Sequence, residues 1–154
     1  IVKIIISNNY KAKGLQYAKI YKIKKKEFNF KNTLPEKKII HVLKKNDINL
    51  ICLAGFMKIL SKNFIKKFDG KIINIHPSLL PKYKGLNTHQ KAIKNKDKFS
   101  GCTVHFVNSK LDSGKIILQR KVGINKKDNE FSLEKKVLKE EHLLYPAAIN
   151  KMLS

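Results

Sequence analysis

The most constraining feature of the sequence is the segment 74–81, Asn-Ile-His-Pro-Ser-Leu-Leu-Pro, which follows the apolar residues Ile72 and Ile73. A short β-branched run that ends in polar residues and two prolines predicts a strand that stops abruptly and opens into a stiff loop. Because side chains alternate along a strand, Asn74 and His76 are expected on the same face. Ligands bind at strand ends in open α/β sheets, so we expect a site here.

Length and composition predict one globular domain over residues 1–154. The chain has 42% hydrophobic residues, with 8 Phe and 5 Tyr, which is enough to build a core. Its apolar runs are all shorter than the ~20 residues that span a bilayer, so we expect no membrane association. The chain begins with Ile1, inside an apolar run, and we therefore expect that its true beginning is missing.

The charge of the chain is strongly basic, at +23. Such a charge suggests a nucleic-acid or acidic-membrane partner. However, Arg120 is the only arginine, and the lysines are spread along the chain, whereas arginine is favoured for phosphate and base recognition. We therefore expect no specific nucleic-acid partner, only salt-sensitive binding to polyanions.

The two cysteines, Cys52 and Cys102, stand in strand-like segments and form no CxxC motif. Such cysteines are typically reduced and buried, which favours a cytoplasmic protein. No metal-ligand spacing is present, so we expect no metal.

Strands are predicted to alternate with helices, which indicates a Rossmann-like α/β domain with a mostly parallel, mixed sheet flanked by helices. The fully apolar run 50–54 is typical of a parallel strand covered on both faces, and the turn 111–114 favours antiparallel pairing of the last two strands. Strands are expected at 1–6, 50–54, 71–76, 102–107 and 116–122, with a short edge strand at Phe28 and Phe30. Helices are expected at 13–21, 35–46, 61–68, 88–95 and 133–152, the last kinked or restarted at Pro146.

The turn Leu111-Asp112-Ser113-Gly114 supplies a carboxylate for the expected site. A carboxylate orients an imidazolium, and an imidazolium beside a neutral amide such as that of Asn74 can stabilise a developing oxyanion on a carbonyl carbon. No serine or cysteine stands in a local nucleophile motif, so acyl or formyl transfer without a covalent intermediate is favoured. The alternative is a purely structural hydrogen-bond cluster.

Three segments together resemble the folate-dependent formyltransferases: Leu-Ala-Gly-Phe-Met-Lys-Ile-Leu at 53–60, the segment 74–81, and Leu-Asp-Ser-Gly at 111–114. Pro77, the segment 85–89 and the segment 141–146 resemble the branch that formylates glycinamide ribonucleotide. The resemblance runs from about Ile1 to Met152.

The resemblance implies that 10-formyltetrahydrofolate, a co-substrate, donates its formyl group to the amine of glycinamide ribonucleotide, a small-molecule substrate, in purine biosynthesis. His76 is then the general acid, Asn74 an oxyanion donor, and Asp112 the group that tunes His76 and helps to accept the proton of the attacking amine. The residues implied to line the folate site are Met57, Lys58, Ile59, Leu60, Asn74, Asn108, Ser109, Lys110, Leu111 and Asp112. Those implied to meet the ribonucleotide are Leu138, Lys139, Glu140 and Glu141, with Glu141 contacting the amine.

The sequence departs from the family pattern at its start. Its glycines are isolated, so the Gly-rich phosphate loop of the family is absent. Ile1 aligns with the second strand of the family, and we therefore expect a formyltransferase fold that lacks its first strand, phosphate loop and first helix. Asn87 stands where a second loop histidine is common.

Several alternatives remain open at this stage. The chain could be a hydrolase of 10-formyltetrahydrofolate, in which water replaces the amine, or a non-catalytic basic fragment. His89 could contact substrate or face solvent, and His105 could enter the site or pack in the core. Glu141 could instead belong to a solvated helix face. The protein is expected to be a monomer or a homodimer.

Overall fold

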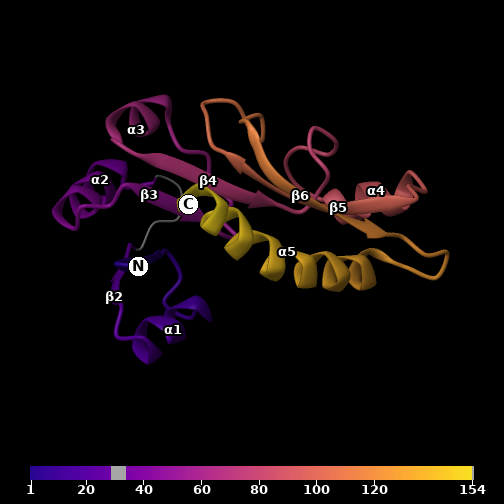
Figure 1. Cartoon of the computed structure of the whole chain (residues 1–154), viewed down its shortest axis with the longest axis horizontal. Helices are drawn as coiled ribbons and strands as arrows, with labels where there is room; N and C mark the ends of the chain where they lie inside the picture. Colours follow the sequence, from indigo (N-terminus) through magenta and orange to yellow (C-terminus); the bar gives the residue numbers. More distant parts are fainter. Residues whose placement is uncertain (29–33, 154) are drawn as a thin grey trace. The chain divides into compact units, whose positions relative to one another are not determined.

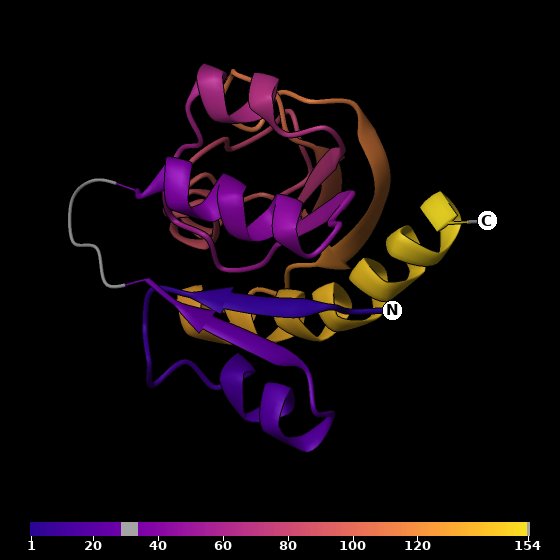
Figure 2. The same ribbon diagram turned by 90° about the vertical axis from the view of Figure 1, so that its left-hand side faces the viewer.

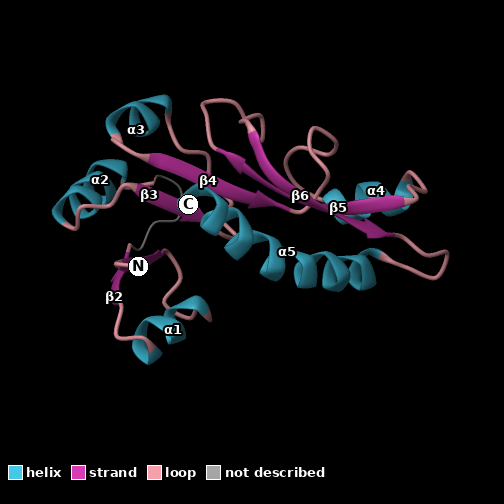
Figure 3. Cartoon of the chain, in the orientation of Figure 1, coloured by secondary structure: helices cyan, strands magenta, loops and turns pink. Residues whose placement is uncertain are grey.

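The structure, a computed structural model, describes residues 1–28 and 34–153. These residues group into two compact units, the first formed by Ile1–Asn49 and Leu60–Gly70 and the second by Leu50–Ile59 and Lys71–Ser154. Each unit combines helices with strands (Figures 1 and 3). The α/β class predicted from the sequence is confirmed.

The first unit contains a parallel pair of strands, β1 (Ile4–Ser7) and β2 (Lys24–Glu27). They lie side by side, and α1 (Gly14–Ile20) connects them (Figure 2). Leu15 and Ala18 are the buried residues of α1. An edge strand was expected at Phe28 and Phe30. The observed strand β2 ends just before Phe28, which is itself buried, and Phe30 lies outside the described residues.

Two further helices, α2 (Glu36–Lys45) and α3 (Lys62–Lys67), belong to the first unit. Ser61 caps α3, since its Oγ accepts a hydrogen bond of 3.0 Å from the backbone nitrogen of Phe64. The Glu36 carboxylate at the start of α2 accepts hydrogen bonds of 2.8 and 2.5 Å from the backbone nitrogen and Oγ of Ser61. Both helices confirm the sequence prediction.

The second unit is built on a four-stranded sheet in the order β3-β4-β5-β6. The parallel pair β3–β4 is followed by two antiparallel pairings, β4–β5 and β5–β6. The antiparallel pairing predicted for the last two strands is confirmed. The elements of this unit are β3 (Leu50–Leu53), β4 (Lys71–His76), α4 (Thr88–Lys94), β5 (Phe99–Phe106), β6 (Ile116–Gly123) and α5 (Glu130–Leu153).

The core of the second unit lies between the sheet and α5. The buried apolar residues of α5 are spaced four, seven and four positions apart and form the apolar stripe that a sheet-facing helix requires. The buried core residues, contributed by the sheet, α4 and α5, are Ile73, Ala92, Cys102, Val104, Leu133, Val137, Leu144 and Ala148. The helix predicted at 133–152 is confirmed, and of the kink or restart expected at Pro146 the restart does not occur, because α5 continues through this residue to Leu153. A proline removes one backbone donor, and the packing on both sides of it offsets that loss.

The prediction that 50–54 is covered on both faces is also wrong. Cys52 is exposed, and its neighbours on β3 are only half-buried. Within the described residues β3 pairs on one side alone, with β4. An edge strand has fewer neighbours to cover it than an interior strand, which explains the exposure. Cys102, on β5, is buried as predicted, and both cysteines are free thiols.

No helix among residues 1–28 and 34–153 is long and apolar enough to cross a membrane.

Candidate active site

Asn74 and His76 occupy the last part of β4, where the strand gives way to the loop after it. In the antiparallel register with β5, Asn74 lies opposite His105 and His76 lies opposite Thr103. Directly opposed residues of such a pair share one face of the sheet. The strand end therefore brings two histidines, an amide and a hydroxyl together, and Asn74 and His76 share a face as predicted.

Asp112 reaches this face from the loop between β5 and β6. Its Oδ2 lies 3.4 Å from Nδ1 of His76, and its Oδ1 lies 3.7 Å from Nε2 of His105. The exposed fractions of the Asp112, His76 and His105 side chains are only 9%, 7% and 3%. Asp112 itself has a left-handed backbone, with φ +43°, which directs its carboxylate inwards. The three residues predicted to act together, Asn74, His76 and Asp112, thus converge with His105 in a shielded site where electrostatic interactions are strong.

His105 combines the two roles that the sequence left open, since it is buried and also lies beside Asp112. Its Nδ1 donates a 2.8 Å hydrogen bond to the Phe106 carbonyl, so Nε2 is free to accept from Nδ2 of Asn74 at 3.5 Å. Burial lowers the pKa of His105 below its ordinary value, although the Phe106 carbonyl and the Asp112 carboxylate oppose this. This geometry indicates that His105 is neutral and that it turns the amide nitrogen of Asn74 towards the site.

The loop after β4 holds both members of the His76–Asp112 pair. The backbone carbonyl of Tyr83 accepts a 2.8 Å hydrogen bond from Nε2 of His76, and the backbone nitrogen of Gly85 donates one of 2.8 Å to Oδ2 of Asp112. Tyr83 was not identified from the sequence. One signal was present, because Tyr83 is the only Phe, Tyr or Trp between Phe68 and Phe99.

Thr103 fastens the beginning of the same loop to β5. Its Oγ1 donates a 2.6 Å hydrogen bond to the Ser78 carbonyl and accepts one of 3.1 Å from the Leu80 nitrogen. Gln119 of β6 adds hydrogen bonds to Oγ1 of Thr103 and to the Leu80 carbonyl, at 2.8 and 2.9 Å. Sequence reasoning also missed Thr103 and Gln119, because their hydrogen-bond partners are distant in sequence.

Known proteins are similar to this chain in sequence and in fold. Residues 1–149 match the formyl transferase family. The chain is 45% identical over 152 residues to a phosphoribosylglycinamide formyltransferase of Haemophilus influenzae, covering 96% of this chain and 72% of that one. The solved structure of phosphoribosylglycinamide formyltransferase from Anaplasma phagocytophilum matches with a TM-score of 0.92 at 42% identity, over 97% of this chain and 72% of that one. The chain belongs to the formyl transferase family.

A longer relative shows the same match over a small part of its length. The human trifunctional purine biosynthetic protein adenosine-3 is 41% identical over 157 residues, which is 99% of this chain and 16% of that protein. The family resemblance predicted from the sequence segments is confirmed.

The residues that family resemblance assigned to a folate site differ in exposure. Met57 and Ile59 follow β3 and are 70% and 69% exposed, as large apolar side chains at a ligand surface can be. Leu60 is instead buried, and it belongs to the first unit. Four of the remaining residues are exposed in the loop between β5 and β6, beside Asp112: Asn108, Ser109, Lys110 and Leu111.

The residues assigned to the ribonucleotide lie on α5, and one of them stands out. Glu141 occupies the sheet-facing stripe of the helix, four residues after Val137 and three before Leu144. Burial and the nearby Glu134 carboxylate raise the pKa of Glu141 to about 6. Glu140 is engaged elsewhere, since its Oε2 accepts a 2.8 Å hydrogen bond from Arg120. The remaining two assigned residues, Leu138 and Lys139, are exposed.

His89, on α4, is half-buried and does not simply face solvent. Burial lowers its pKa, although the Glu134 and Glu130 carboxylates of α5 act in the opposite direction. Its buried Nδ1 has no hydrogen-bond partner among the described residues. The structure therefore places His89 on α4 close to the Glu130 and Glu134 carboxylates of α5.

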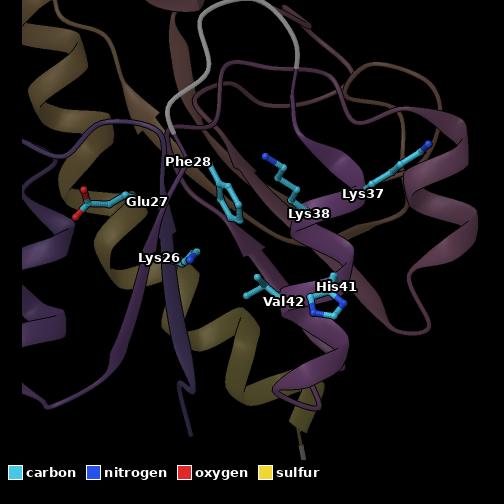
Figure 4. A pocket seen from close by; sticks show the side chains of 7 residues that line it. All are labelled: Lys26, Glu27, Phe28, Lys37, Lys38, His41 and Val42. Atoms are coloured by element: carbon cyan, nitrogen blue, oxygen red, sulfur yellow. The ribbon is translucent and has the colours of Figure 1, made fainter.

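An open pocket of about 550 Å³ lies in the first unit between β2 and α2 (Figure 4). Three of its seven lining residues are lysines, and it contains none of the residues predicted to carry chemistry. We therefore place the candidate active site at the end of β4. The pocket is lined by Lys26, Glu27, Phe28, Lys37, Lys38, His41 and Val42.

Within the described ranges 1–28 and 34–153, no group of three or more His, Cys, Asp or Glu side chains is arranged to hold a metal ion.

Proposed function

We propose that this chain forms one formyltransferase domain that transfers the formyl group of 10-formyltetrahydrofolate to the amine of glycinamide ribonucleotide, in the cytoplasm. The observation that carries the proposal is the convergence of Asn74, His76 and Asp112 in a shielded site of a formyl transferase family member. The names of the relatives support the choice of glycinamide ribonucleotide as acceptor.

The transfer proceeds by direct attack of the amine on the formyl carbon. The oxygen of the formyl group gains negative charge in the tetrahedral intermediate, and the Nδ1–H of His76 and the amide of Asn74 donate hydrogen bonds to it. Asp112 helps to accept the proton that the amine nitrogen loses, directly or through a water molecule. The bond from the formyl carbon to N10 of the folate then breaks, N10 takes up the proton that the amine released, relayed through Asp112 and Nδ1 of His76, and tetrahydrofolate leaves. No covalent enzyme intermediate is formed.

The folate and ribonucleotide approach the three groups from different elements. Met57, Ile59 and the loop 108–112 provide apolar and backbone contacts for the folate. Glu141 of α5 supplies a carboxylate for the amine of the ribonucleotide. Because the pKa of Glu141 is about 6, the carboxylate is mostly ionised at neutral pH and gains a cationic or hydrogen-bonding partner when the substrate binds.

The nearest rival is a hydrolase that gives the formyl group to water. An absorbance assay of formyl loss from a 10-formyl folate analogue, with and without glycinamide ribonucleotide, separates the two reactions. The H. influenzae relative serves as the positive control. Loss that requires the ribonucleotide establishes the transferase, loss without it establishes the hydrolase, and the absence of both loss and folate binding rejects the proposal.

A further inference from the structure

The hydrogen bond from His76 to Tyr83 decides which nitrogen of the imidazole carries a hydrogen. Nε2 of His76 lies 2.8 Å from the Tyr83 carbonyl oxygen, and a carbonyl can only accept. Nε2 must therefore be protonated in both the neutral and the charged ring. The other nitrogen, Nδ1, faces Oδ2 of Asp112 at 3.4 Å. Only the proton on Nδ1 can come and go.

Tyr83 is itself held in an unusual backbone conformation. Its φ of +55° is in the left-handed region, which bulky residues rarely adopt. Its phenol donates a 2.8 Å hydrogen bond to Oδ2 of Asp97 and accepts one of 2.7 Å from Nδ2 of Asn95, both at the end of α4. Such a conformation persists where the surroundings determine it. The anchored side chain thus fixes the direction of the carbonyl that meets His76.

Asp97 is well suited to be this anchor. Burial disfavours its charge, but hydrogen bonds from Lys82 and Tyr83 hold the pKa of its carboxyl below the ordinary value. Nζ of Lys82 lies 2.7 Å from Oδ1 of Asp97 while Tyr83 uses Oδ2. The carboxylate is ionised at neutral pH and binds two consecutive residues of the loop.

We propose that Tyr83 is a positioning residue that fixes the tautomer of His76 and leaves Nδ1 as its acid–base nitrogen. The Tyr83 phenol, tied to Asp97 and Asn95, aims the carbonyl at Nε2, while Gly85 holds Oδ2 of Asp112 opposite Nδ1 through its 2.8 Å hydrogen bond. Tyr83 contacts neither formyl donor nor acceptor in this scheme. Its catalytic consequence rests on the proposed function, whereas the tautomer does not.

The tautomer is measured on the unmodified 154-residue chain by ¹⁵N NMR of its histidine rings, with the His76 signals assigned by their loss in His76→Gln. At a pH where the ring is neutral, Nε2 is expected to carry the hydrogen and Nδ1 to show the shift of a bare nitrogen. The opposite pattern would overturn the proposal whatever the activity. The expected pattern in a chain that transfers no formyl group would uphold the tautomer and reject the proposed function.

The role of the side chain is measured with Tyr83→Phe, which removes only the anchoring hydroxyl. The neutral His76 ring is expected to become a mixture of tautomers, and kcat to fall about tenfold with the KM for folate changed less than about twofold. Tyr10→Phe removes the hydroxyl of an exposed tyrosine and should change neither quantity.

A second variant, Asp97→Asn, keeps an acceptor of the same shape but removes the charge. It should shift the tautomer and kcat in the same direction as Tyr83→Phe, by a smaller factor. Wild-type tautomer and kcat in both variants would show that Tyr83 is only a structural loop anchor, and the proposal would fail.

Discussion

The carboxylate of Asp112 lies 3.4 Å from Nδ1 of His76, and both side chains are more than nine-tenths buried. Neither residue reaches this position alone, because His76 ends a strand and Asp112 belongs to a distant loop. The loop after β4 connects them, with Tyr83 bound to one and Gly85 to the other. In such a shielded pair, removal of one partner leaves the other without its counterpart, so the two residues should behave as a unit.

The first prediction concerns this pair. His76→Ala should lower kcat by a factor of about 10² to 10⁴, as expected for a general acid, with the Kd of a folate analogue changed only a few-fold. Asp112→Asn should have an effect of similar size. Because each residue needs the other, the double variant should be little worse than either single one. Steady-state kinetics and analogue binding measure all three variants.

A matched control for these variants is His41→Ala, which removes an exposed histidine of α2 and should leave kcat unchanged. If His76→Ala retains kcat within about tenfold of the unmodified chain, the assignment of His76 as general acid is wrong. Additive losses in the double variant would mean that the two residues act independently.

The second prediction uses the raised pKa of Glu141, about 6 against an ordinary value of 4.5. A carboxyl whose pKa is higher in the folded state destabilises the fold when it ionises, so stability is lost as pH rises from 4.5 through 6. Glu141→Gln removes this ionisation. With allowance for solvent screening, we expect the free energy of unfolding of the variant at pH 7 to exceed that of the unmodified chain by about 1 kcal/mol. At a pH below 4.5, the ordinary pKa of glutamate, this gain in stability should vanish.

Urea unfolding at pH 7 and pH 4 measures this difference. The neighbouring substitution Glu140→Gln provides the control, because Glu140 is paired with Arg120 and its removal should bring no gain at pH 7. If Glu141→Gln has the same free energy of unfolding as the unmodified chain at both pH values, the ionisation of Glu141 does not destabilise the fold and the prediction is wrong. In the transfer assay Glu141→Gln should also raise the KM for the ribonucleotide while affecting the KM for folate little.

The sequence predicted those parts of the site that depend on local pattern. Alternation along β4 was enough to place Asn74 and His76 on one face. Asp112 was proposed as the carboxylate of the site from its turn, and the resemblance to a family strengthened that proposal, since nothing local ties the loop after β5 to the end of β4. The α/β class and most element positions followed from apolar periodicity, which reflects burial directly.

The features that sequence reasoning missed depend on distant partners. Tyr83 has a left-handed backbone and its phenol binds Asp97 and Asn95, and no propensity of tyrosine indicates either feature. The sequence left a kink or a restart open at Pro146, and the absence of a restart in α5 depends on packing against the sheet, which outweighs the local preference of proline. Cys52 is exposed because β3 is an edge strand among the described residues, and an apolar run looks the same at an edge as inside a sheet.

The third prediction concerns Thr103, whose hydroxyl has three hydrogen-bond partners around the start of the loop. Thr103→Val keeps the shape but leaves the Ser78 carbonyl, the Leu80 nitrogen and the Gln119 amide without this partner. We expect a loss of about 3 kcal/mol in unfolding free energy, because unpaired buried polar groups cost about 1–3 kcal/mol each and some of them will relax. Thr103→Ser retains the hydroxyl and should lose less than about 1 kcal/mol.

Urea denaturation compares these two variants, and kcat should follow the same order because the loop also carries the carbonyl that meets His76. Equal stability of Thr103→Val and Thr103→Ser would show that the hydroxyl does not fasten the loop.

The last prediction tests how closely the turn that carries Asp112 is fitted to β5. A Cβ added at Gly114 would collide with the backbone carbonyl of Phe106, and the Phe106 nitrogen is itself bound to the Lys115 carbonyl at 2.9 Å. The turn must therefore shift in Gly114→Ala, which moves Asp112 relative to His76. We expect about 2 kcal/mol lower stability and at least about a tenfold fall in kcat. Gly123→Ala, where a Cβ meets nothing within 4 Å, should stay within about 0.5 kcal/mol of the unmodified chain and keep its kcat. Unchanged kcat in Gly114→Ala would mean that the 3.4 Å separation of Asp112 and His76 does not limit the reaction.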